Sequence, residues 1–524
     1  MPVPALPSRS ASLRLLPLLP LLLSAVLAGC ASLPSLEGRV PSQVVTDTAH
    51  TQLATAIAPM VAQHPGVSGI YPLVDGRDAF AARALLAAAA QRSLDVQYYI
   101  WHKDITGTLL FDALRQAAER GVRVRLLLDD NNTAGLDQIL TMLGKQQNLE
   151  IRLFNPFLPR APRALAFATD FSRLNRRMHN KSFTADNQAT IVGGRNVGDE
   201  YFGAAGDVLF ADLDVLAIGP VVDDVSHDFD RYWNSASAYP ARLLLTSPVE
   251  GDAATIAAEA DRIDDTKAAE EYVQALRTSP FVKQMMERTL PFEWARTRMV
   301  SDDPAKVLDK ARPGTGVAEN LQNLLGVPKK EVDLVSPYFV PGKSGTQAFA
   351  DLAKKGVGVR ILTNALEATD VAAVHAGYAK WRKPLLEAGV LLYESRRSWE
   401  AGDAREQTGR FGSSASSLHA KTFAVDDQRI FVGSFNFDPR SIELNTEMGL
   451  VIDSPALASQ LGLAMRTTIP QRAYQVLLGD DGALYWIARD ASGATTRYDT
   501  EPGTSVWKRM GVAILSVLPI DWLL

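Results

Sequence analysis

The chain has 524 residues, of which 47% are hydrophobic and 22% are charged. This composition is typical of a globular protein with room for more than one hydrophobic core. The formal net charge of −5 argues against nucleic acid as a partner, because nucleic-acid-binding proteins usually carry a basic surplus.

Residues 1–29 have the pattern of a bacterial signal peptide. Arg9 and Arg14 precede an apolar run, residues 15–29, that is too short for a comfortable membrane span. The run leads into LAGC (27–30), which resembles the lipobox of bacterial lipoproteins, in which the cysteine is lipidated. Cys30 is the only cysteine of the chain, so no disulfide can form within it.

This resemblance implies a lipoprotein anchored to a bacterial membrane through Cys30 and facing the periplasm. The alternative is an uncleaved signal anchor with an incidental cysteine. Ala31 and Ser32 follow Cys30, and the absence of Asp beside it favours the outer over the inner membrane. Residues 30–65 are polar and dotted with proline, which predicts a tether between the lipid and the folded body.

One α/β pattern occurs twice in the body of the chain. LDVQYYIW (94–101) alternates like a strand, and a helical pattern follows it up to Gly121 and the strand VRVRLLL. Residues 333–364 repeat the plan, so that Arg125 and Arg360 are equivalent and lie 235 residues apart. A near-constant offset over such a length indicates two copies of one α/β unit.

The domains follow from this repeat. We expect an N-terminal domain over 66–325, with a helical insertion at about 252–325, and a C-terminal domain over 326–470. In residues 471–524 a Gly-Asp-Asp-Gly turn predicts a hairpin. The last apolar stretch starts with cations and carries a tryptophan near each end. It either docks on the core, which we favour, or lies in a membrane interface.

Nearly the same polar string stands in both copies. Residues 177–203 read RMHNKSFTADNQATIVGGRNVGDEYFG, and residues 417–440 read SLHAKTFAVDDQRIFVGSFNFDPR. Alternate residues of a strand point to one face, so each histidine is predicted to share a face with the lysine two positions later. The repeated residues are His179, Lys181 and Asp186 in the first copy and His419, Lys421 and Asp426 in the second.

In each string the second predicted strand ends in small residues, and an asparagine follows them. Small residues let a backbone approach a ligand closely, and the segment after them can begin a helix with unpaired N–H groups. Two imidazoles, two ammonium groups and two carboxamides suit a phosphodiester whose oxygens gain charge in the transition state. The candidate phosphate-binding residues are Gly193, Gly194 and Asn196 in the first copy and Gly433, Ser434 and Asn436 in the second.

The duplication itself argues that the histidines are functional. A lone histidine on a half-apolar strand is more often a core residue, but two of the seven histidines share one six-position pattern in equivalent places. One imidazole can attack phosphorus while the other protonates the leaving alcohol, so the copies must face each other across a pseudo-two-fold axis. A lysine beside each histidine opposes a metal site. His102, His227 and His375 have no such support.

The segment before His179 carries Arg173, Arg176 and Arg177. It is either a solvated basic loop or a patch for a second phosphate group, such as a lipid headgroup.

The motif HxKx4D, followed by GG or GS and an asparagine, resembles the phospholipase D superfamily in both copies. The longer strings are most similar to its cardiolipin synthase C branch, over roughly residues 65–524. The resemblance implies two pseudo-two-fold-related α/β domains, each a central mixed sheet flanked by helices, with the active site at their interface. Both half-sites lie in one chain, so no oligomer is required.

The resemblance also implies a mechanism through a phosphohistidine, without metal or cofactor. His179 is expected to be the nucleophile and His419 the acid and base, while Asp186 and Asp426 are turn and framework residues rather than proton carriers. A carboxylate usually holds each imidazole of the family. Glu447 fits one copy and Asp214 the other, with Asp212 as the second choice.

Three functions remain open at this point. The first is a phosphatidyltransferase that makes cardiolipin from phosphatidylglycerol, with phosphatidylglycerol or phosphatidylethanolamine as donor. The second is a phosphodiesterase of the same superfamily acting on phospholipids, with nucleic acid less favoured because of the acidic charge. The third is a non-catalytic lipid-binding lipoprotein, which would not need two intact motifs.

Overall fold

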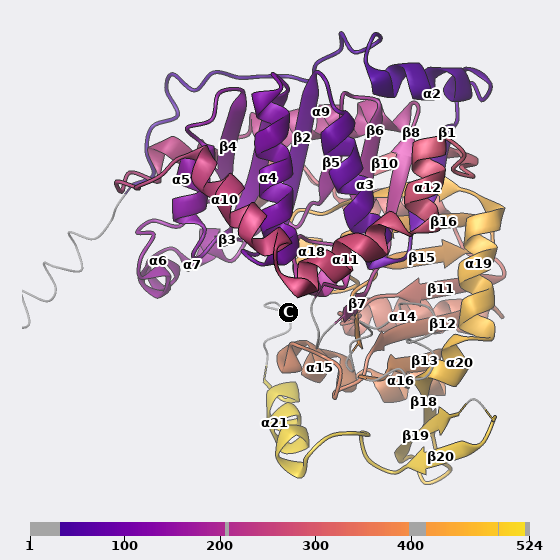
Figure 1. The fold of residues 1–524 in the computed structure, drawn as a ribbon. Helices are drawn as coiled ribbons and strands as arrows, with labels where there is room; N and C mark the ends of the chain where they lie inside the picture. Colours follow the sequence, from indigo (N-terminus) through magenta and orange to yellow (C-terminus); the bar gives the residue numbers. More distant parts are fainter. Residues whose placement is uncertain (1–31, 205–208, 398–415, 491, 519–524) are drawn as a thin grey trace, which may run out of the picture.

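An 18-stranded mixed sheet runs through both halves of the chain in the computed structural model. The structure describes residues 32–204, 209–397, 416–490 and 492–518, and the signal-peptide prediction and Cys30 lie outside them. Figure 1 shows the N-terminal half in indigo and magenta above the C-terminal half in orange and yellow. Among the described residues, no helix has the length and apolar character needed to cross a membrane.

The two halves repeat one sheet topology. Each half contains three neighbouring parallel strands, which are β2-β3-β4 in the first half and β11-β12-β13 in the second. Three antiparallel strands continue the sheet beyond β2 in the first half and beyond β11 in the second. In the first half the strands of this pattern are β2 (Ser93–Ile100), β3 (Arg123–Asn132), β4 (Leu149–Phe154), β5 (Ser182–Ala185), β6 (Ala189–Gly193) and β8 (Asp214–Ile218). Those of the second are β11 (Glu331–Val335), β12 (Gly358–Asn364), β13 (Leu391–Ser395), β15 (Thr422–Val425), β16 (Arg429–Gly433) and β17 (Met448–Asp453).

A buried ion pair marks the equivalence of the two halves. Arg125 on β3 donates from Nε to Asp95 on β2 at 2.6 Å, and the two residues are register partners. Arg360 on β12 makes the same bond to Asp333 on β11, also at 2.6 Å and in register. The predicted α/β fold with two related mixed sheets is therefore confirmed.

A strand within the expected helical insertion joins the two halves. β10 (Glu293–Ser301) pairs with β1 (Ser68–Leu73) through residues 293–295 and with β17 through residues 296–301, both antiparallel. The prediction of a helical insertion over 252–325 is thus wrong in part. Its helices are α10 (Ala253–Asp264), α11 (Lys267–Arg277), α12 (Pro280–Glu287) and α13 (Val317–Leu325). The sheet of the second half begins before the boundary expected at 325.

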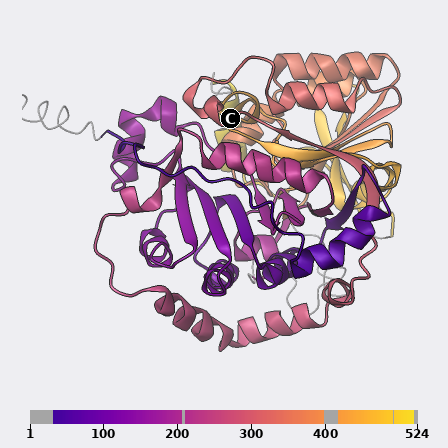
Figure 2. The same cartoon turned by 90° about the horizontal axis from the view of Figure 1, so that it is seen from above.

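Helices cover both faces of each sheet. Figure 1 shows α3 (Gly76–Ala89) and α4 (Ile105–Glu119) in front of the first sheet, with α10 and α11 crossing in front of them and α12 to the right of α3. Figure 2 shows these three helices as an outermost layer on that side. On the other face α9 (Val221–Trp233) packs on β5, β6 and β8. In the second half α14 (Gly342–Lys354) and α16 (Arg382–Glu387) pack on β12 and β13, and α19 (Pro455–Arg466) packs on β15 and β16.

A shared apolar core fixes the two halves together. It combines Val192 and Val215 of the first half with Val432 and Leu450 of the second, all fully buried. These residues lie on β6, β8, β16 and β17, the strands that follow the repeated motifs, so hydrophobic burial brings the two motifs together.

The segment predicted as a tether is packed along much of its length. The Arg39 guanidinium donates to the carbonyl oxygens of Ser235 at 2.6 Å and Asn234 at 2.7 Å. The helix α2 (Gln52–Ala62) buries Leu53 and Ile57 against the first half. Only residues before this contact can act as a tether, because the backbone from Arg39 onward is held by the fold.

The C-terminal end has the predicted hairpin, formed by β18 (Ala473–Leu478) and β19 (Leu484–Arg489). A third strand, β20 (Thr495–Tyr498), pairs with β19. The terminal helix α21 (Val506–Ser516) buries Val512 against Leu366 and Ala376 in the second half. Docking on the core is therefore observed for one face of this helix, while Trp507 on the same helix is 79% exposed.

We predict that Leu450→Ala lowers the free energy of unfolding by about 2–5 kcal/mol, because it leaves a cavity in the core shared by the two halves. Leu463→Ala is the matched control, since Leu463 is 57% exposed on α19, and it should change stability by less than about 0.5 kcal/mol. Equilibrium urea unfolding measures both. Equal effects of the two substitutions would contradict the shared core.

Candidate active site

Each motif histidine is bonded through its backbone to the opposite half of the molecule. The His179 amide donates to the Thr446 carbonyl at 2.8 Å, and the Thr446 amide returns the bond to the Arg177 carbonyl at 2.9 Å. The His419 amide donates to the Ala211 carbonyl at 2.8 Å, beside the parallel pair of β7 (Leu209–Ala211) with β14 (Ser416–Leu418). The histidines therefore stand before strands β5 and β15, not within them as predicted.

Each imidazole is held by a carboxylate from the opposite half. His179 Nδ1 lies 2.8 Å from Glu447 Oε2, and His419 Nδ1 lies 2.5 Å from Asp212 Oδ2. Both carboxylates are fully buried, and the histidine side chains are only 10% and 12% exposed. Because each Nδ1 faces a carboxylate, each Nε2 is left to face a substrate.

The structure corrects the expected partner of His419. Asp214, the first choice, accepts a hydrogen bond from Arg83 Nη2 at 2.8 Å and from the Arg195 amide at 3.1 Å. Asp212 and Asp214 are two residues apart, so a strand pattern gives both the same face and cannot separate them. Asp214 starts β8 and stays with its own half, whereas Asp212 precedes the strand and reaches across the interface.

Each motif lysine folds back on its own histidine. Lys181 Nζ donates to the His179 carbonyl and Lys421 Nζ to the His419 carbonyl, both at 2.5 Å. Burial, the largest influence, lowers the pKa of Lys181 to about 7 and that of Lys421 to about 8. A bound anion would raise the pKa of both groups toward the ordinary value, because opposite charge favours the protonated form.

The electrostatics show that the two half-sites meet. Burial holds the pKa of His179 well below its ordinary value, and the positive charges of Lys181, Lys421 and His419 add to this effect. Burial and Lys421 also lower the pKa of His419, while Asp212 opposes the shift. Two of the groups that act on His179 come from the second half, so the site is one cluster.

The two carboxylates titrate in opposite directions. Burial raises the pKa of Glu447 to about 7, although Lys181 opposes the shift. Burial also disfavours the charged form of Asp212, but His419 and Lys421 outweigh it and hold the pKa of Asp212 below its usual range. The pair of Asp212 with His419 therefore has more ion-pair character than the pair of Glu447 with His179.

The motif aspartates lie in the turns and hold backbone, as expected. The Asp186 carboxylate accepts from the amides of Arg92 at 2.7 Å and Ser93 at 2.9 Å. The Asp426 carboxylate accepts from the amides of Lys330 at 2.6 Å and Glu331 at 3.0 Å, at the start of the equivalent strand. Both aspartates have positive φ, 51° and 56°, which suits tight turns between paired strands.

The small residues after the motifs serve strand packing rather than ligand contact. A Cβ on Gly193 would lie 2.5 Å from the Asp214 Cα, and one on Gly433 would lie 2.4 Å from the Met448 carbonyl oxygen. A Cβ on Gly194 would meet the Asp212 carboxylate.

The backbone amides of Gly194 and Ser434 are also unavailable to a ligand. The Gly194 amide donates to the Leu213 carbonyl at 3.1 Å, and the Ser434 amide donates to the Met448 carbonyl at 2.9 Å. The expectation that Gly193, Gly194, Gly433 and Ser434 bind phosphate is not supported by this geometry. Instead, the Ser434 hydroxyl donates to Glu447 Oε2 at 2.5 Å, and so Ser434 helps to position the carboxylate of His179.

The two motif asparagines differ. Asn196 accepts from the Ile100 amide at 3.2 Å and donates to the Tyr201 hydroxyl at 3.0 Å, so it is part of the framework. Asn436 is buried, and its side-chain oxygen has no hydrogen-bond partner among the described residues. Of the two, Asn436 is the one left to contact a ligand.

Aromatic rings close around the histidines, and the motif spacing did not reveal them. The Tyr99 ring lies 5.0 Å from the His179 ring, while Tyr201 and Phe210 lie 5.3 and 5.2 Å from the His419 ring. Tyr99 lies near the end of the strand LDVQYYIW, and Tyr201 lies in the segment DEYF that follows Asn196. Aromatic residues at such places are usually core residues, so only the fold assigns them to the site.

The three arginines before His179 are structural. Arg177 Nη2 pairs with buried Asp129 at 2.7 Å, and Arg173 Nε pairs with Asp170 at 2.6 Å. Arg176 donates to the Lys306 carbonyl at 3.1 Å. These bonds make the segment a framework, so neither a solvated loop nor a second phosphate patch describes it.

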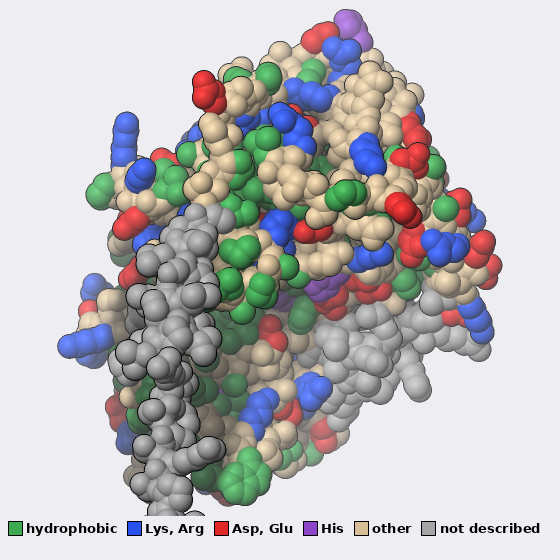
Figure 3. Space-filling model, turned by 90° about the vertical axis from the view of Figure 1, so that its left-hand side faces the viewer, with side chains coloured by type: hydrophobic (Ala, Val, Ile, Leu, Met, Phe, Trp, Pro, Cys, Tyr) green, Lys and Arg blue, Asp and Glu red, His purple; other side chains and the backbone are tan. Residues whose placement is uncertain are grey.

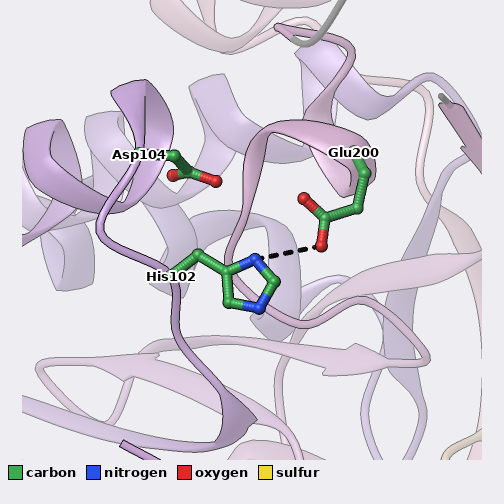
Figure 4. Close-up of side chains that lie close together, drawn as sticks. All are labelled: His102, Asp104 and Glu200. Carbon is green, nitrogen blue, oxygen red and sulfur yellow. Dashed lines mark ion pairs between the residues drawn. The ribbon is translucent and has the colours of Figure 1, made fainter. Parts of the chain in front are cut away.

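Within the described part of the chain, two groups of side chains outside this cluster have the composition of a metal site. Figure 4 shows His102, Asp104 and Glu200, with His102 Nδ1 3.1 Å from Glu200 Oε1. Asp104 is already used as a helix cap, since it accepts from the Gly107 amide at 2.9 Å and the Asp199 amide at 2.7 Å. The second group, Glu331, Asp333 and Asp427, is paired with Arg360 and Arg466. Both groups are therefore explained by bonds within the protein.

Comparisons with known proteins agree with this geometry. The family described as "Cardiolipin synthase, PLD-like domain" matches residues 84–233 and 321–466, one match in each half. Cardiolipin synthase C of Escherichia coli (strain K12) is 50% identical over 479 residues, which cover 90% of this chain and 100% of that protein. The chain belongs to the cardiolipin synthase family of phospholipase D-like proteins.

Other similarities extend over nearly the whole chain of this family member. An uncharacterized protein of Helicobacter pylori (strain ATCC 700392 / 26695) is 32% identical over 494 residues, covering 94% of this chain and 96% of that one. The crystal structure of phosphatidylserine synthase from Haemophilus influenzae Rd KW20 superposes with a TM-score of 0.53 at 16% identity, covering 81% and 91%. That likeness shows that the two chains share a fold.

We predict that Asp212→Asn lowers the pKa of His419, because the substitution removes a negative charge that favours the imidazolium. NMR titration of labelled histidines measures this pKa. Asp214→Asn is the matched control: it should leave the titration of His419 unchanged and lower the unfolding midpoint, since it removes the negative charge that pairs with buried Arg83. A shift of His419 in Asp214→Asn alone would contradict the assignment.

Proposed function

We propose that this protein is a phosphatidyltransferase that forms cardiolipin through a phosphohistidine intermediate. The observation that carries the proposal is the single buried cluster of two imidazoles and two ammonium groups, in which a carboxylate of the opposite half holds each imidazole. The relative named cardiolipin synthase C supports the choice of product, since it matches over its whole length.

The asymmetry of the two pairs supports a division of labour. His179 has the more strongly lowered pKa, so its neutral form is available, and with Nδ1–H donated to Glu447 the Nε2 lone pair can attack phosphorus. The pKa of His419 is lowered less far, because the ionised Asp212 opposes the effect of burial, so His419 is the imidazole that more readily carries the proton for the leaving alcohol.

The second half of the reaction reverses the proton transfer. The P–O bond to the leaving alcohol breaks as the Nε2–P bond forms, and His419 gives its proton to that alcohol. The neutral His419 then takes a proton from the hydroxyl of phosphatidylglycerol as this oxygen attacks phosphorus and the N–P bond breaks. The product is cardiolipin, and both imidazoles return to their starting states.

Lys181 and Lys421 would bind the non-bridging phosphate oxygens, whereas the Asn436 oxygen, unpaired among the described residues, can accept only from a donor such as a ligand hydroxyl. Both lysines are buried in one cationic cluster, and a phosphodiester anion compensates the cost of that burial. Their charge also stabilises the negative charge that develops in the transition state.

Two finer choices belong to the same proposal. The donor is phosphatidylglycerol or phosphatidylethanolamine, since either yields the same intermediate on His179. A phosphodiesterase that hydrolyses phospholipids is the second candidate, because water can replace the acceptor alcohol at that intermediate.

The location of the protein in the cell is a further part of the proposal and rests on residues 1–30. We propose that Cys30 is lipidated and holds the protein on the periplasmic side of a bacterial membrane, with the outer membrane favoured. The support is the LAGC string at the end of an apolar run. An anchor beside the lipid substrate would suit an enzyme whose two substrates are both membrane phospholipids.

We predict that the wild-type chain restores cardiolipin when it is expressed in a bacterium that lacks its own cardiolipin synthases. His179→Ala and His419→Ala should each abolish the product, and the double substitution should be no worse, because the two residues act as a unit. Lipid extraction and mass spectrometry measure the outcome. Phosphatidic acid in place of cardiolipin would favour the hydrolase, and substantial product from either single variant would refute a shared site.

We predict that the wild-type protein takes up labelled palmitate and fractionates with membranes, whereas Cys30→Ala takes up none. Several acyl chains anchor stably, while one chain binds reversibly. Activity on lipid dispersed in detergent should survive in Cys30→Ala, since His179 and His419 lie far from residue 30 in the sequence. An unlabelled wild-type protein with an intact N-terminus would show a signal anchor instead.

A further inference from the structure

We propose that a groove along the short helices α6 (Arg163–Thr169) and α7 (Phe171–Leu174) holds one acyl chain of the lipid whose phosphate lies at His179. The proposal deepens the proposed function and rests on its substrate class.

The groove is large and mainly apolar. Its volume is about 680 Å³, within the range of ligand sites. The Phe157 and Phe167 rings stack with centroids 6.5 Å apart, and the Phe167 and Phe171 rings meet edge to face at 5.0 Å. Its full lining is Asn131, Phe157, Arg163, Ala164, Phe167, Ala168 and Phe171.

One tyrosine side chain connects the groove to the catalytic cluster. Asn131, in the groove lining, donates from Nδ2 to the Tyr99 hydroxyl at 3.4 Å. The Tyr99 ring lies 5.0 Å from the His179 ring and 5.5 Å from Lys181 Nζ. In a phospholipid only the glycerol separates the phosphate from the start of the acyl chains, so a chain can enter the groove while the phosphate stays at His179.

The one charged side chain of the lining, Arg163, is bonded within the protein. Arg163 Nη1 donates to the carbonyls of Asp130 at 2.6 Å and Asn131 at 2.8 Å, and Nη2 donates to the Thr133 hydroxyl at 2.9 Å. Its guanidinium lies over the Phe157 ring at 5.1 Å. The groove thus offers few hydrogen bonds to a peptide backbone, whereas a hydrocarbon chain needs none.

Apolar side chains also stand exposed beside the groove. Leu165 is 50% exposed and Phe171 is 37% exposed. Figure 1 shows α6 and α7 projecting from the left-hand side of the first half, and Figure 3, which views that side, shows hydrophobic side chains among lysines and arginines. Exposed apolar surface of this kind marks a binding surface for an apolar partner.

The decisive experiment fills the groove and varies the length of the chain. Ala164→Trp and Ala168→Trp place a bulky ring in the lining, and both alanines are exposed, so the fold should tolerate them. Ala258→Trp on the exposed face of α10 is the matched control. The measured quantity is kcat/KM for dihexanoyl and for dipalmitoyl phosphatidylglycerol in detergent micelles at fixed mole fraction.

We expect the groove variants to lose about tenfold on the dipalmitoyl substrate, the effect of removing roughly two methylene groups from contact, and less than twofold on the dihexanoyl one. The Ala258→Trp variant should behave as wild type on both. Equal losses on both lipids, or no loss on either, would overturn the acyl-chain groove and leave the proposed function intact.

A labelling experiment keeps the groove testable without turnover. A phosphatidylglycerol with a photoreactive diazirine in its acyl chain should label residues 163–174 of the wild-type chain, and the label should fall in Ala168→Trp. Labelling confined to other segments would refute the groove. Labelling of 163–174 without any turnover of phosphatidylglycerol would instead refute the proposed function.

Discussion

The reciprocal hydrogen bonds between imidazoles and carboxylates of opposite halves are the constraint on which the site depends. His179 of the first half needs Glu447 of the second, and His419 of the second half needs Asp212 of the first. A carboxylate fixes the orientation and tautomer of an imidazole only within hydrogen-bond distance, so the halves have little freedom to move apart. The shared apolar core, the strand β10 and the pairing of β7 with β14 all keep the two halves in the position that these hydrogen bonds require.

A symmetric duplication nevertheless gives an asymmetric centre. Both histidines and both lysines are buried together, and each cation disfavours the charge on its neighbours. The two carboxylates make the histidines different, because the pKa of Glu447 is raised to about 7 while that of Asp212 is held low. Groups whose environments push their pKa values apart are suited to separate acid and base roles. The proposed nucleophile and proton donor follow from this difference, which the repeated motif alone does not contain.

Much of the fold could be predicted from the sequence because its signals are local. The alternation in LDVQYYIW, the stop at Gly121 and the turns at Asp186 and Asp426 are set by neighbouring residues, and the structure has strands and turns at those places. The approach of His179 to His419 could also be inferred, since a half-site repeated in one chain has to meet its copy.

The predictions that were wrong concern contacts between residues that are distant in sequence. Whether Asp212 or Asp214 reaches His419 depends on where β8 begins, and the strand character of β10 depends on pairing with β1 and β17. The glycines after each motif were expected to face a ligand, but the close approach of β6 to β8 and of β16 to β17 requires them. Strand pairing of this kind is decided by tertiary contacts rather than by local propensity.

In the proposed mechanism one site, assembled from both halves, forms a covalent intermediate on His179. Trapping that intermediate tests it most directly. Incubation of His419→Ala with phosphatidylglycerol, followed by rapid quenching and peptide mass spectrometry, should show a phosphatidyl adduct on His179, because the nucleophile remains and the group that activates the acceptor is gone. An adduct on His419 in the converse variant, His179→Ala, with none on His179 in His419→Ala, would contradict the account.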